Sequence, residues 1–214
     1  MRENARTESQ DRQPLFVDAT RQWKPAATLL HAARSLRQLA LDHEPASHWV
    51  ALSGIVMLAF SVEGFCQTYG ERLFSTEEWV GVDRKGIERK PVKDKLRLIG
   101  EKVGVPVDFG QKPWSDIHAL LQVRDALAHP RPMEKRVAQQ FWLSHEESQT
   151  FLTKDIVQFD WEILSQPVVA EQLQSNVETA LSSLLTAMGV STWELDSMGT
   201  GSYMISKVRA QSEG

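Results

Sequence analysis

The feature that most constrains the fold of this chain is an apolar run of fourteen residues, Trp49–Val62. A helix needs about 20 apolar residues to cross a bilayer, so a run of this length favours a buried helix over a membrane span. Ser47 can cap the helix, and the stretch from there to Phe74 is apolar on most sides. The sequence therefore predicts one central core helix.

Four further segments have apolar residues at three- and four-residue steps, as on one face of a helix. Pro25 suits a first helical position, and the segment that it opens ends near Asp42. A second helix is expected to start at Pro91, and a third, Trp114–Ala128, must end at or before Pro130. The last follows Pro167 and ends at Gly189. The expected fold class is all-α, with four to six helices around one core.

The pattern also predicts how the 214 residues are divided. Residues 1–22 are polar and have no sustained apolar period, so we expect a mobile N-terminal arm. Residues 23–189 form the helical domain, and residues 190–214 form a flexible C-terminal tail. The assignment of Phe151–Trp161 stays open, because its β-branched and aromatic residues suit a short extended segment as well as a helix.

Composition excludes several classes of protein. Hydrophobic residues make up 42% of the chain and charged residues 24%, which is enough apolar material for a packed core. The formal charge of −4 argues against a protein that coats double-stranded DNA. Cys66 is the single cysteine, so no intramolecular disulfide or cysteine zinc cluster can form. With a polar N-terminus and no export signal, we expect a cytoplasmic protein that has no membrane partner.

The segment with candidate catalytic residues is the end of the helix expected at Trp114–Ala128, where Arg124 and Asp125 are followed by His129 and Pro130. Cutting RNA without a metal needs a base for the ribose 2′-hydroxyl and a cation for the phosphate. Histidine and arginine suit these two tasks. Five residues rotate a helix by about 500°, so the two side chains lie about 140° apart and cannot share one face. The spacing therefore indicates that one copy alone does not complete the site.

This segment resembles the motif helix of the HEPN-domain family, in which an arginine and a polar residue precede a histidine that proline often follows. The similarity extends over about residues 25–190, including an apolar helix that carries Glu63. It implies an up-and-down HEPN-like bundle that pairs as a homodimer and acts without cofactor or metal as an endoribonuclease in toxin or defence systems. Arg124 would hold the phosphate, His129 would transfer protons and Asp125 would orient one of them, with Glu63 as a supporting acid. The implied partners are RNA, a second copy and an antitoxin protein.

The charge distribution favours a local RNA site. Residues 84–136 hold 13 Lys and Arg against seven Asp and Glu, although the whole chain is acidic. A phosphate-binding face needs such a local field. The candidate phosphate-binding residues are Lys93 before the motif, and Arg131, Lys135 and Arg136 after it.

Two other interpretations stay open. Arg124 can pair with Glu63 and hold two helices together, while His129 merely caps the last carbonyls of its helix. The chain would then be a non-catalytic module for dimerisation and protein contacts, or an unrelated helical domain. Arg131 occupies the position where family members regulated through a tyrosine carry that residue, so this form of control is not expected.

Overall fold

The computed structural model describes residues 15–21, 24–42, 47–129, 160–197 and 201–207. They belong to two compact units. One unit is helical and comprises Lys24–Met198, and the other comprises the two ends of the chain.

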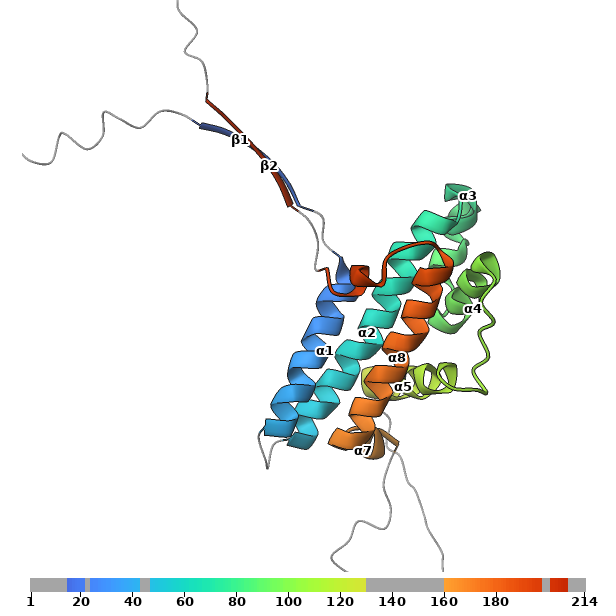
Figure 1. Ribbon diagram of the computed structural model, residues 1–214. Helices are drawn as coiled ribbons and strands as arrows, with labels where there is room; N and C mark the ends of the chain where they lie inside the picture. The colour runs from blue at the N-terminus through green and yellow to red at the C-terminus, as the bar shows by residue number, and fades with distance from the viewer. Residues whose placement is uncertain (1–14, 22–23, 43–46, 130–159, 198–200, 208–214) are drawn as a thin grey trace, which may run out of the picture. The chain divides into compact units, whose positions relative to one another are not determined.

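The helical unit confirms the all-α class (Figure 1). Its described residues form seven α-helices: α1 (Pro25–Asp42), α2 (Ser47–Leu73), α3 (Thr76–Trp79), α4 (Val92–Val103), α5 (Trp114–Ala128), α7 (Asp160–Leu164) and α8 (Pro167–Ala187). Short 3₁₀ turns add Val82–Arg84, Ile87–Arg89 and Thr192–Leu195. The expected number of four to six was too low because α3 and α7, at four and five residues, are too short to show a helical period.

Helix α2 is the core helix that the apolar run predicts. It contacts α1, α4, α5 and α8, and Figure 1 shows it lying beside α1 with the two axes nearly aligned. Val62, Phe65 and Cys66 in its middle are completely buried. Burial raises the pKa of the Cys66 thiol to about 12, so the thiol stays protonated at neutral pH and serves as core packing.

The length argument against a membrane span needs correction. Ser47–Leu73 is a helix of 27 residues, and by length and composition alone it could cross a membrane. Half of its most apolar window is buried within the helical unit. The contacts of α2 with four neighbouring helices, rather than the fourteen-residue run, identify it as the core helix.

Helices α4 and α5 are bounded by local signals that the sequence predicts. Helix α4 has Pro91 at its N-cap and Gly104, in the left-handed conformation with φ 77°, at its C-cap. Helix α5 ends at Ala128, and His129 leaves the helix with φ −127° and ψ 64°. The residue before proline avoids helical angles, which explains why the helix stops there.

A cluster of ion pairs joins α1 to the C-terminal part of the helical unit. The Arg34 guanidinium donates two hydrogen bonds of 2.9 Å to the carboxylate of Glu178 in α8. Its third nitrogen donates to Asp196 Oδ1 at 2.6 Å. Leu195 lies beside this cluster in sequence, is 4% exposed and belongs to the hydrophobic core. Residues 192–197 therefore pack with the helical unit, although the sequence analysis placed them in a flexible tail from residue 190.

We expect Glu178→Gln to lower the free energy of unfolding by roughly 1–2 kcal/mol at pH 7, because it removes one charge from a two-point hydrogen-bonded pair. Burial acts to raise the pKa of Glu178, but the hydrogen bonds from Arg34 and Gln174 outweigh it, so the pKa lies below its ordinary value of 4.5. This carboxylate thus stabilises the fold above that value, and the stabilisation is lost as the pH falls through the lower folded pKa. Urea unfolding across this pH range measures the difference.

The matched control is Glu171→Gln. Glu171 pairs with Arg37 from the same two helices at 3.2 Å, but its side chain is 62% exposed. An exposed pair contributes about 0–1 kcal/mol, so this variant should stay close to the wild type. Equal losses in the two variants, or a Glu178→Gln deficit that persists in acid, would contradict the assignment.

The second unit contains a strand pair formed by the two ends of the chain. Strand β1 (Leu15–Arg21) runs antiparallel to β2 (Gly201–Lys207), with Leu15 opposite Lys207 and Arg21 opposite Gly201. The sequence analysis assigned these residues to a mobile arm and a flexible tail. A pairing between strands so far apart in the chain leaves no local turn signal, so the sequence pattern gives no indication of it.

Candidate functional site

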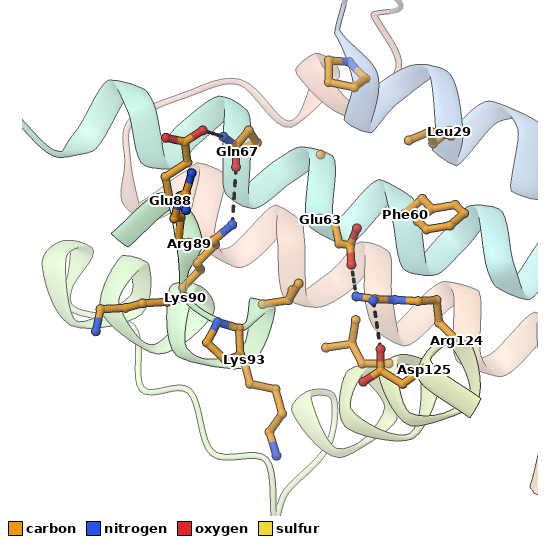
Figure 2. A pocket seen from close by; sticks show the side chains of 16 residues that line it. Leu29, Phe60, Glu63, Gln67, Glu88, Arg89, Lys90, Lys93, Arg124 and Asp125 are labelled. Carbon is orange, nitrogen blue, oxygen red and sulfur yellow. Dashed lines mark hydrogen bonds and ion pairs between the residues drawn. The ribbon is translucent and has the colours of Figure 1, made fainter. Parts of the chain in front are cut away.

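A groove of about 770 Å³ lies between α1, α2, α5 and the segment that leads into α4 (Figure 2). Its lining contains five basic side chains and three acidic ones. Its apolar lining residues include Leu29 of α1, Phe60 of α2 and Leu121 of α5. The groove therefore combines a local positive charge with apolar surface, although the chain as a whole is acidic.

One face of α2 forms the floor of the groove. Phe60, Glu63 and Gln67 follow one another at steps of three and four residues, which places them on one side of a helix. Arg124 and Asp125 approach this floor from α5. Both helices belong to the packed core, so the groove is built on rigid elements.

The basic rim of the groove depends on a tight turn between α3 and α4. Gly81 has φ 70°, a conformation that favours glycine. A Cβ atom on Gly86 would lie 2.2 Å from the backbone oxygen of Trp79, so only glycine fits there. The two glycines let the chain fold back on Trp79, and this brings Arg89 and Lys90 to the groove.

Arg124 is held between two carboxylates at the centre of the site (Figure 2). Its Nη2 contacts Glu63 Oε1 on α2, and its Nη1 lies 2.8 Å from Asp125 Oδ1. Its Nε atom is buried and has no hydrogen-bond partner among the described residues. The side chains of Arg124 and Glu63 are 20% and 33% exposed, whereas that of Asp125 is 63% exposed. Asp125 is therefore the partner that a ligand can most easily displace.

His129 lies at the end of the same helix, outside the groove lining. Its backbone N–H donates to the carbonyl oxygen of Asp125 at 3.0 Å, and the residue is exposed. Arg124 thus lines the groove, whereas His129, which has left the helix, does not.

Four of the sequence-predicted site residues lie together in the groove, and a fifth, His129, is not part of its lining. The four are Arg124, Asp125, Glu63 and Lys93. The remaining candidates, Arg131, Lys135 and Arg136, lie outside the described residues. The pairing of Arg124 with Glu63 is the contact that the non-catalytic interpretation expects.

Sequence analysis missed Phe60, Gln67 and Glu88 as lining residues. The available signal was the position of Glu63, since residues three before it and four after it share its helix face. Gln67 lies within 3.3 Å of Glu88 and 3.4 Å of Lys95, and so connects α2 to the basic segment. Both contacts of Gln67 join residues distant in sequence, and no local pattern indicates them.

In the part of the chain that the structure describes, no group of three or more His, Cys, Asp or Glu side chains is placed to hold a metal ion. Arginine and lysine are the side chains that this groove offers to an anion. These cations can bind phosphate, and an exposed imidazole such as that of His129 can transfer protons.

Comparisons with protein-family models, with curated proteins and with solved structures found no match to this chain. The functional assignment is therefore argued from the geometry and chemistry of the groove.

Proposed function

We propose that this chain is a HEPN-like, metal-independent endoribonuclease that works as a cytoplasmic homodimer in a toxin or defence system. The observation that carries the proposal is the position of Arg124. It lies in a groove with a basic rim, and an exposed histidine lies at the end of the same helix. RNA is the substrate, and a toxin of this kind would have an antitoxin protein as a further partner.

The proposed reaction is a transesterification within the RNA. A His129 imidazole takes the proton of the ribose 2′-hydroxyl, and the 2′-oxygen then bonds to the adjacent phosphorus. The bond from phosphorus to the 5′-oxygen breaks, and this oxygen takes up a proton from the imidazolium formed at His129. Arg124 stabilises the charge that builds on the phosphate oxygens. The products have a 2′,3′-cyclic phosphate and a 5′-hydroxyl.

The two carboxylates around Arg124 have different roles in this proposal. A phosphate oxygen replaces the exposed Asp125 at Nη1, which frees Asp125 to orient a proton. Glu63 is less exposed and stays bound to Nη2, so that the guanidinium plane keeps its direction. Since His129 is not part of the lining that contains Arg124, a second copy would bring its histidine to the phosphate.

The test is to incubate the purified full-length chain with RNA in EDTA. Cleavage should proceed and leave cyclic-phosphate ends, because no step requires a metal. The same sequence with 2′-O-methyl groups should stay intact, since it has no 2′-hydroxyl to act as nucleophile. Products with 3′-hydroxyl ends, or cleavage that needs added Mg²⁺, would contradict the proposed mechanism.

One observation favours a second candidate, a non-catalytic module for dimerisation and protein contacts. The ion pair between Arg124 and Glu63 joins α5 to α2 and occupies the arginine without any ligand. A chain that sediments as a dimer and leaves RNA intact would support this alternative over the nuclease.

A further inference from the structure

The groove has two chemically different ends (Figure 2). Leu29 and Phe60 lie at one end and make it apolar. Arg89, Lys90 and Lys93 lie at the other end, which stays net basic although Glu88 lies beside them. A ligand that fills the whole groove therefore needs an apolar part and an anionic part.

Phe60 supplies an available aromatic surface. It is 36% exposed, although it belongs to the core helix of the molecule. Its ring stacks on no other aromatic ring in the described part of the chain. An exposed ring at the edge of a groove offers a face on which a flat ligand can stack.

The basic end supplies available positive charge. No ion pair in the described ranges involves Arg89 or Lys90, and both are exposed. The Lys93 ammonium lies 4.9 Å from the centre of the Phe109 ring, and no ion pair in the described ranges involves it. The first turn of α4 also lines this end, and its helix dipole adds to the positive potential there.

From this arrangement we infer that the groove binds a nucleotide unit of single-stranded RNA. The base stacks on Phe60, and the backbone phosphates lie at Arg89, Lys90 and Lys93. A nucleotide joins a flat ring to a phosphate, and its base is free to stack only where the strand is unpaired. The volume of about 770 Å³ lies within the roughly 300–1,000 Å³ of small-ligand sites. This inference rests on the proposed function and names single-stranded RNA as its substrate class.

Binding is measured separately from cleavage with a probe that the proposed reaction cannot cut. The probe is a fluorescein-labelled single-stranded RNA octamer with a 2′-O-methyl group on every residue, titrated with the full-length chain and followed by fluorescence anisotropy. The wild type should bind this probe more tightly than a 2′-O-methyl duplex of the same sequence, because the duplex has no free base to stack.

The aromatic end is tested with three variants. We expect Phe60→Ala and Phe60→Leu to bind the probe about five- to a hundredfold more weakly, because both remove the stacking surface. The leucine variant keeps apolar bulk at this position, so it separates loss of stacking from loss of folding. Trp193→Ala removes an aromatic residue that is 64% exposed and is not part of the groove lining, and it should bind like the wild type.

The basic end is tested through the salt dependence of binding. Removing two phosphate contacts with Arg89→Ala and Lys93→Ala together should lower the slope of log affinity against log salt by about 1.4. Lys102→Ala is the matched control. Lys102 lies on α4 and pairs with Glu78 at 3.9 Å, outside the groove lining, so its loss should leave the slope unchanged.

The outcomes separate this inference from the nuclease proposal. If probe binding depends on Phe60 and the basic end but natural RNA is not cleaved, the groove binds RNA and the chain is not a nuclease. If the chain cleaves natural RNA but substitutions at these residues do not change probe binding, the nuclease proposal stands and the inference that the groove binds RNA is wrong. Tighter binding of the duplex, or displacement of the probe by polyglutamate but not by unlabelled octamer, also overturns it.

Discussion

Replacing His129 with alanine is expected to lower the rate of RNA cleavage in EDTA by about 10²- to 10⁴-fold, because it removes the proposed proton-transfer group. The side chain is exposed and forms no part of the core, so the free energy of unfolding should change by less than about 0.5 kcal/mol. Initial rates on a fluorogenic RNA, together with thermal unfolding of the same preparations, measure both quantities.

His31→Ala is the matched control for this loss of activity. His31 lies on α1 and contacts the carbonyl oxygen of Asp196 at 2.9 Å, outside the groove lining. Cleavage should continue in this variant at close to the wild-type rate. If the wild type cleaves RNA and His129→Ala cleaves it equally fast, His129 is not the proton-transfer group. If both are inert, the isolated chain is not a nuclease.

The largest effect on stability is expected at Phe65. Its side chain is fully buried in α2, and its ring lies 4.7 Å from that of Tyr69, between ring centres. Phe65→Ala should lower the free energy of unfolding by about 3–5 kcal/mol, because it removes apolar surface and leaves a cavity. Urea denaturation at pH 7 measures this loss.

Phe60 provides the comparison within the same helix. The two residues are five positions apart, but Phe60 is 36% exposed at the groove whereas Phe65 is fully buried. Phe60→Ala should therefore cost less than half as much stability while weakening RNA binding. If Phe60→Ala destabilises the chain as much as Phe65→Ala, Phe60 is a core residue and not a ligand-stacking surface.

Much of the helical fold could be read from the sequence because its signals are local. Pro25 and Pro167 stand at the first positions of α1 and α8, and Pro130 follows His129, the C-cap residue of α5. Each proline acts on its own backbone and on the residue before it. The apolar periods between these residues then decided which face of each helix is buried.

The candidate site was predictable only in part, because its residues come together from distant segments. The motif gave Arg124, Asp125 and His129, but not the pairing state of the arginine. Which carboxylate reaches that arginine depends on how α2 packs against α5, and the sequence analysis left this as an alternative. The groove itself also needs the turn at Gly81 and Gly86 to bring the basic segment to α2.

For the apolar run Trp49–Val62 too, the sequence determined one part of the outcome and the tertiary structure another. Periodicity and hydrophobic burial, which act along one helix, predicted that this run lies in the core. Its pattern did not show that Phe60 stays partly exposed while Phe65 is sealed. That difference arises where α1, α5 and the segment before α4 leave a gap over one face of α2. The pairing of β1 with β2 likewise joins opposite ends of the chain. Contacts of this kind depend on the packing of whole elements, so only the tertiary structure reveals them.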